Sequence, residues 1–104
     1  MENENTKALY IIVNAGFSEE AIEITRACGA KGATIINARG TAGSQYKLNG
    51  IHYEPEKEMI ISLVDKEVAD KIMTEVRESV GVATPAQGIC FCMPVERMTL
   101  LKKY

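Results

Sequence analysis

Four short apolar segments and two amphipathic segments alternate along this chain, and their order restricts the folds that it can adopt. The apolar segments are rich in Ile, Val and Ala, and each has the length of a β-strand. These four predicted strands are Lys7–Asn14, Ala33–Ala38, Lys57–Val64 and Ile89–Met93. The resulting order, β-α-β-β-α-β, predicts an α+β fold of the ferredoxin-like βαββαβ type, an antiparallel sheet with two helices on one face. Right-handed crossovers would put the first and third strands at the centre.

Capping residues mark the ends of the two predicted helices. Ser18 can cap the first helix, and Gly29 is well placed to end it in a left-handed conformation. Asp65 can cap the second helix, and Gly81 follows its apolar stripe. Because both helices would cover the same face of the sheet, the other face needs a cover from outside the chain. We therefore expect a symmetric oligomer.

Length and charge narrow the class of protein. The chain has 104 residues and a formal net charge of −2, so we predict a single domain over residues 7–104 that follows a disordered tail over residues 1–6. The chain lacks a basic block, which argues against a nucleic-acid partner. It also lacks an apolar run of the ~20 residues that a membrane span requires, and its N-terminus does not resemble a signal peptide. We expect a cytoplasmic protein without membrane insertion.

The stretch Ala30–Gly43 carries the first functional hypothesis. Its strand ends at Arg39 and enters a glycine-bearing loop, Gly40–Gly43. Such a loop can present backbone N–H groups to an anion or nucleotide, or it can simply permit a turn. Arg39 can pair with a phosphate, or it can be a solvated residue at the end of a strand. The polar segment that follows contains three aromatic side chains that could contact a partner protein: Tyr46, His52 and Tyr53. Lys47, Glu54, Glu56 and Lys57 are expected to form a solvated rim.

Two motifs carry a family resemblance. GAKGATIINARG (residues 29–40) and QGICFCMPVERM (residues 87–98) resemble the PII-type nitrogen-regulatory and PII-like signal-transduction proteins, and the resemblance covers Leu9 to Met98. It implies a homotrimer with effector clefts between subunits. The implied effector is ATP, ADP or AMP. The implied partner of the protruding T-loop is a transporter, a metabolic enzyme or a regulator.

The resemblance also suggests a set of effector-binding residues. Thr34 falls where the family contacts adenine, and Gly40, Thr41, Ala42 and Gly43 fall at the base of the T-loop near the ribose and phosphates. Gln87, Gly88 and Ile89 fall in the B-loop. There the family pattern is Gly-Asp-Gly-Lys, whereas this chain has Ala86-Gln87-Gly88-Ile89, so that Ile89 replaces the phosphate-facing lysine. No catalytic triad, metalloprotease motif or phosphate-transfer motif is found, and we expect a protein that is not an enzyme.

Two cysteines offer an alternative function. Cys90 and Cys92 share one side of a strand because alternate residues do so. With His52 they could bind a soft metal ion, as proposed for the trimeric CutA-like proteins. We favour the simpler interpretation, in which they are buried core or interface thiols. A trimer that has lost effector binding is a third possibility.

Overall fold

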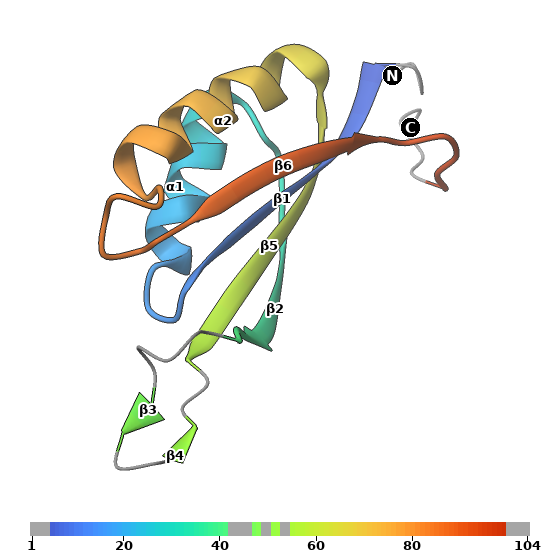
Figure 1. Cartoon of the computed structure of the whole chain (residues 1–104). Helices are drawn as coiled ribbons and strands as arrows, with labels where there is room; N and C mark the ends of the chain where they lie inside the picture. The colour runs from blue at the N-terminus through green and yellow to red at the C-terminus, as the bar shows by residue number, and fades with distance from the viewer. Residues whose placement is uncertain (1–4, 42–46, 49–50, 53–54, 100–104) are drawn as a thin grey trace.

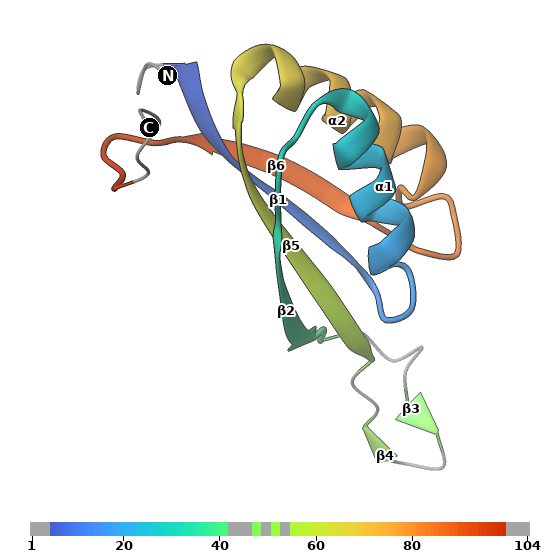
Figure 2. The same ribbon diagram turned by 180° about the vertical axis from the view of Figure 1, so that it is seen from behind.

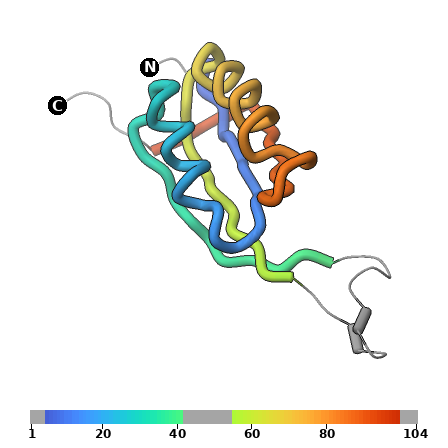
Figure 3. Tube along the Cα trace, turned by 90° about the vertical axis from the view of Figure 1, so that its left-hand side faces the viewer, coloured from blue at the N-terminus to red at the C-terminus, as the bar shows by residue number. Residues whose placement is uncertain are grey.

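The computed structural model describes residues 5–41, 47–48, 51–52 and 55–99, and two layers make up its body. The elements are β1 (Thr6–Asn14), α1 (Ser18–Cys28), β2 (Thr34–Arg39), β3 (Lys47–Leu48), β4 (Ile51–His52), β5 (Glu56–Asp65), α2 (Lys66–Ser79) and β6 (Ile89–Pro94). The four long strands form an antiparallel sheet in the order β2-β5-β1-β6. Helices α1 and α2 lie side by side on one face of this sheet (Figures 1, 2 and 3). This confirms the ferredoxin-like prediction, with the first and third long strands at the centre.

The sequence did not predict the short antiparallel pair β3–β4. Lys47 pairs with His52, and Leu48 with Ile51. In Figure 1 this pair lies beyond the ends of β2 and β5, in the segment that we predicted to be a loop.

The hydrophobic core lies between the sheet and the two helices. Leu9, Ile11 and Val13 alternate along β1 and are completely buried, and Ile11 is paired with the equally buried Ile60 of β5. The helices contribute the buried residues Ala21, Ala69, Ile72 and Val76. The buried residues thus alternate along β1 and recur along α2 at helical spacing, as the geometries of a strand and a helix require.

The N-terminus of α1 differs from the prediction. Ser18 is the first helical residue. Phe17 occupies the N-cap position, and its side chain makes no capping hydrogen bond. The predicted Ser18 cap is therefore wrong. Instead, Oε1 of Glu58 in β5 accepts the backbone N–H of Gly16 (3.1 Å) and of Ser18 (3.3 Å). At the other end, Gly29 adopts the predicted left-handed conformation with φ 116°.

Other element ends shift by one or two residues. Asp65 occupies the N-cap position of α2 as predicted, although its side chain makes no capping hydrogen bond, and α2 ends at Ser79, before Gly81. Thr6, assigned to the tail, begins β1 and is completely buried. Among the described residues, neither helix has the length and apolar character needed to cross a membrane.

The sheet face opposite the helices is apolar, and we call it the open face. It is formed by alternate residues of the four strands: Tyr10, Ile12, Ile36, Ile61, Leu63, Ile89, Phe91 and Met93. Tyr10 and Phe91 stack at its centre, with ring centroids 5.0 Å apart and planes at 11°. Leu63, Phe91 and Met93 remain 40%, 40% and 46% exposed. Clustered apolar exposure of this kind is typical of an interaction surface.

Candidate functional site

Three segments that are far apart in the sequence meet at Asn14, the last residue of β1. Its backbone N–H donates to the carbonyl of Ala86 (2.9 Å) and its side-chain Nδ2 donates to the carbonyl of Pro85 (2.8 Å). Its Oδ1 accepts a hydrogen bond from Nζ of Lys57 in β5 (2.7 Å). Asn14 thus connects the turn before β6 to the first residues of β5, because β1 is central in the sheet and its end lies next to both.

Residues 40–55 connect β2 to β5, and we call them the 40–55 segment; its base is the point where Gly40 and Pro55 meet. Lys57 lies next to this base. Gly40 closes this base by donating its N–H to the carbonyl of Pro55 (2.9 Å). An added methyl group at Gly40 would lie 2.7 Å from Cε of Lys57, so the lysine side chain crosses directly over the glycine. Lys57 was expected to belong to a solvated rim, but it is half-buried and its ammonium group is held by Asn14. That expectation is wrong for Lys57.

A cleft of about 380 Å³ opens at this base, and we call it the loop-base cleft. It is lined by Ala15, Asn37, Ala38, Arg39, Glu56, Lys57 and Glu58. The cleft carries both cationic and anionic side chains: Arg39 ends β2 and is paired in register with Glu56 of the neighbouring strand β5, which also contributes Lys57 and Glu58. Its chemistry therefore suits a small polar ligand with charged groups.

The turn between α2 and β6, which is the turn before β6 named above, ends in a backbone hydrogen bond and a closely packed glycine. Gly88 donates its N–H to the carbonyl of Val80 (2.7 Å), and a methyl group at Gly88 would lie 2.4 Å from that same oxygen and 3.0 Å from Cγ1 of Val13. Gln87 has φ 48°, which is in the left-handed region, and its N–H donates to the carbonyl of Thr84 (3.0 Å). Glycine is thus required at position 88 for close packing, whether or not a ligand binds there.

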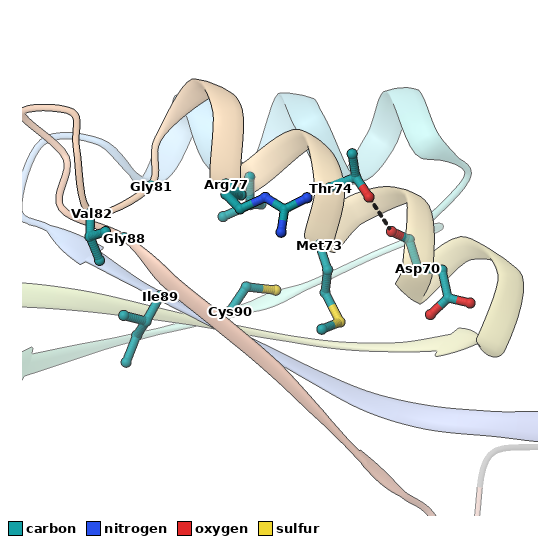
Figure 4. A pocket seen from close by; sticks show the side chains of 10 residues that line it. Asp70, Met73, Thr74, Arg77, Gly81, Val82, Gly88, Ile89 and Cys90 are labelled. Atoms are coloured by element: carbon teal, nitrogen blue, oxygen red, sulfur yellow. Dashed lines mark hydrogen bonds between the residues drawn. The ribbon is translucent and has the colours of Figure 1, made fainter.

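A second cleft, of about 600 Å³, lies between α2 and β6, and we call it the α2–β6 cleft (Figure 4). It is lined by Asp70, Met73, Thr74, Val76, Arg77, Gly81, Val82, Gly88, Ile89 and Cys90. The side chains of Met73 and Cys90 point into the space between helix and strand, whereas that of Ile89 points away from the helix. The Thr74 hydroxyl donates to the backbone carbonyl of Asp70 (3.2 Å).

The residues predicted to bind the effector divide between these two clefts. Arg39 lines the loop-base cleft, and Gly88 and Ile89 line the α2–β6 cleft. Thr34 is exposed at the opposite end of β2 from Arg39, about 17 Å away at the usual strand rise. One chain therefore does not bring Thr34 and Arg39 together.

Several residues of the predicted site fall outside the described part of the chain. Ala42, Gly43, Tyr46 and Tyr53 fall outside the described residues, and only the backbone of His52 is described. Of the remaining predicted residues, Thr41 and Gln87 are exposed.

The two strand cysteines face the helices. Cys90 and Cys92 are half-buried and pack against the hydrophobic core, which agrees with the core location of the simpler interpretation but not with complete burial. Burial, with a smaller effect from neighbouring Cys92, raises the pKa of Cys90 to about 12, so forming the thiolate that a metal ion binds costs more at Cys90 than at an ordinary cysteine. Within the described part of the chain, no three His, Cys, Asp or Glu side chains are grouped to hold a metal ion. The metal hypothesis that includes His52 remains a prediction.

Sequence reasoning missed Asn14 and Glu58 and misjudged Lys57. All three act over long range, and each reaches a residue at least 40 positions away. One signal was present: in an antiparallel sheet with the first and third strands paired, the end of Lys7–Asn14 lies opposite the start of Lys57–Val64.

Comparison with known protein families shows the family to which the chain belongs. The model of the nitrogen regulatory protein P-II family matches residues 6–103. The chain belongs to the PII family. No curated protein matches the sequence.

Solved structures of PII-like proteins share this fold. A structure of a PII-like signalling protein from Thermus thermophilus is 24% identical, with 85% of this chain and 83% of that chain covered and a TM-score of 0.66. CPII from Thiomonas intermedia K12, described as a nitrogen regulatory PII-like protein bound to ADP, AMP and bicarbonate, is 21% identical, with 92% and 96% covered and a TM-score of 0.68. B. subtilis GlnK in complex with ATP is 16% identical, with 89% and 85% covered and a TM-score of 0.69. At these identities the similarity establishes the PII fold.

Proposed function

We propose that this PII-family chain is a non-enzymatic signalling protein that binds an adenine nucleotide in clefts between three copies of the chain. The observation that carries the proposal is the meeting of two segments at Asn14. The base of the 40–55 segment and the turn before β6 are held together there, and both contain residues that the sequence assigned to the effector. The solved relatives with bound ADP, AMP or ATP support the choice of nucleotide.

A homotrimer would complete these clefts. The open face carries large apolar side chains with the Tyr10–Phe91 stack at its centre, and burial of such a surface between copies is strongly favourable at about 25 cal/mol per Å² of apolar area. Thr34 and Arg39 lie at opposite ends of the edge strand β2. In the proposed trimer, Thr34 of one copy would therefore serve the cleft of a neighbouring copy, on the adenine side.

The phosphates would meet few cations from the turn before β6. Ile89 directs an apolar side chain to the open face, where the family pattern has lysine. A hydrogen bond between charged groups is worth about 1.5–3 kcal/mol, which corresponds to roughly tenfold or more in affinity. Without that lysine, we expect ATP, ADP and AMP to bind with affinities within about tenfold of one another.

The 40–55 segment would act as the partner-contacting element. Tyr46, His52 and Tyr53 are the proposed contact residues, and a transporter or a metabolic enzyme is the proposed kind of partner. Regulation requires that the nucleotide bind two arrangements of this segment with different affinity, because a ligand with equal affinity shifts no equilibrium. We propose that the protein acts in the cytoplasm.

Isothermal titration calorimetry on the metal-free protein tests the nucleotide proposal. We expect saturable binding of at least one of ATP, ADP and AMP, with one site per chain. Arg39→Ala, in the loop-base cleft, should weaken binding. The control is Arg26→Ala, an exposed arginine of α1 that pairs with nearby Glu23. Absence of heat with all three nucleotides would contradict the proposal and favour a trimer without effector binding.

A further inference from the structure

The structure connects the base of the 40–55 segment to the turn before β6 through one side chain. Nζ of Lys57 donates to Oδ1 of Asn14 (2.7 Å), and Nδ2 of the same amide donates to the carbonyl of Pro85 (2.8 Å). An amide that accepts on one side and donates on the other is polarised by both partners, and each bond strengthens the other. Because the positive charge of Lys57 is on the accepting side, it makes the amide a better donor to Pro85.

The amide is also fixed in orientation by this arrangement. Its oxygen can only accept and its nitrogen can only donate, so a flip of the amide would leave both Lys57 and the Pro85 carbonyl unpaired. The backbone of Asn14 is held in addition by its N–H bond to the carbonyl of Ala86 (2.9 Å). The side chain therefore has one arrangement that satisfies all of its partners. Displacement of Lys57 removes the hydrogen bond that fixes the amide oxygen in that arrangement.

The lysine is in turn sensitive to the backbone beneath it. Its side chain crosses Gly40, where an added methyl group would lie 2.7 Å from Cε and 3.4 Å from Cγ. Gly40 is the residue that closes the base of the 40–55 segment through its N–H bond to the carbonyl of Pro55 (2.9 Å). Movement of this base is therefore expected to displace the Lys57 side chain, which lies against the position that a methyl group at Gly40 would occupy.

We propose that Asn14 is a positioning residue that couples the base of the 40–55 segment to the turn before β6, through the path Gly40–Lys57–Asn14–Pro85. A change at Gly40 displaces Lys57, the Asn14 amide loses its polarising partner, and the turn that holds Gln87 and Gly88 loosens. The coupling is a property of the ligand-free chain. Its regulatory meaning rests on the proposed function, since the two coupled ends carry residues assigned to the effector.

Amide hydrogen exchange on the ligand-free protein tests the coupling. The probes are the amides of Gln87 and Gly88, which donate to the carbonyls of Thr84 and Val80. Lys57→Met retains the apolar stem and removes the charge, and we expect it to raise exchange at these two amides about three- to tenfold, within the usual range for contacting residues. The control is Lys71→Met, an exposed lysine of α2, which should leave both rates unchanged.

Two further variants separate coupling from a loss of overall stability. Gly40→Ala changes neither Lys57 nor Asn14, whose side chains form the hydrogen bond between them. It should nevertheless raise the exchange rates at Gln87 and Gly88, as Lys57→Met does. Asn14→Asp keeps the acceptor for Lys57 and removes the donor to Pro85, so adding Lys57→Met to it should produce little further increase. Exchange at the core residue Ile60 should not change in any of them.

Three results would overturn the coupling. They are unchanged exchange at Gln87 and Gly88 in Lys57→Met, full additivity of Asn14→Asp and Lys57→Met, and an equal rise at Ile60, which would indicate general destabilisation. Nucleotides are absent from this experiment. A chain that shows the coupling but binds no nucleotide in calorimetry would therefore contradict the proposed function alone.

Discussion

Replacing Gly88 by alanine is expected to destabilise the fold because the position has no room for a methyl group. The added carbon would lie 2.4 Å from the carbonyl oxygen of Val80 and 3.0 Å from Cγ1 of Val13. The first neighbour is backbone and the second belongs to the buried core, so neither can move away cheaply. Overpacking of this kind costs about 1–3 kcal/mol. The displaced backbone would also weaken the Gly88–Val80 hydrogen bond of 2.7 Å, which adds about 0.5–1.5 kcal/mol.

The free energy of unfolding should therefore fall by about 1.5–4.5 kcal/mol, a large part of the roughly 5–15 kcal/mol typical of a domain. Urea denaturation followed by circular dichroism measures it, and with a slope of about 2 kcal/mol/M the midpoint should fall by about 1–2 M. Wild type and variant must be compared at equal chain concentration, because assembly contributes to apparent stability.

Gly32→Ala provides the matched control for Gly88→Ala. Gly32 is exposed, and an added methyl group there would meet nothing within 4 Å. Its unfolding free energy should stay the same or rise by at most about 1 kcal/mol, because alanine restricts the unfolded chain. A Gly88→Ala variant within about 0.5 kcal/mol of wild type, on the scale of ordinary surface substitutions, would refute the packing argument.

Three further predictions concern other parts of the molecule. Glu58→Gln should lower the unfolding free energy by about 0.5–2 kcal/mol in urea denaturation, because it weakens the cap of α1, whereas the same change at exposed Glu75 should have little effect. The pKa of Cys90, raised to about 12 by burial, predicts that iodoacetamide at pH 8 leaves Cys90 unmodified by mass spectrometry in the native protein and modifies it in urea. Because the unfolded thiol ionises first, near its ordinary pKa of 9.0, stability should be constant below that pH and fall between there and about pH 12; an equally fast native reaction would contradict the burial. Phe91→Glu should convert the proposed trimer to single chains of 11.4 kDa in light scattering, while Val82→Glu, at an exposed apolar residue outside the open face, should not; an unchanged mass for Phe91→Glu would argue against assembly through that face.

The sequence predicts the fold well because the information for it is local. Each predicted strand is a continuous apolar run, and the left-handed Gly29 ends its helix within its own neighbourhood. The strand order then follows from general rules about crossovers. The N-terminus of α1 was predicted wrongly because its cap comes from Glu58, 40 residues after Ser18. A local pattern cannot reveal a partner at that separation, and Ser18 satisfied the local pattern.

The candidate site was predicted less completely for the same reason. Glycine-bearing segments can be recognised in sequence, and Arg39, Gly88 and Ile89 do line clefts. The direction of Ile89 follows from alternation along β6, which puts it on the open face opposite Cys90. The role of Asn14 depends on a contact across 71 positions. It becomes visible only when the sheet is assembled in its correct register.

The position of Asn14 in the sheet explains why a single short residue can link the two segments. Only a central strand has neighbours on both sides, and β1 lies between β5 and β6. The last residue of β1 is therefore adjacent both to the start of β5, where the 40–55 segment ends, and to the turn that leads into β6. A residue without both a donor and an acceptor would serve only one side. Asparagine has both, so the link between the segments depends on side-chain chemistry as well as on strand order.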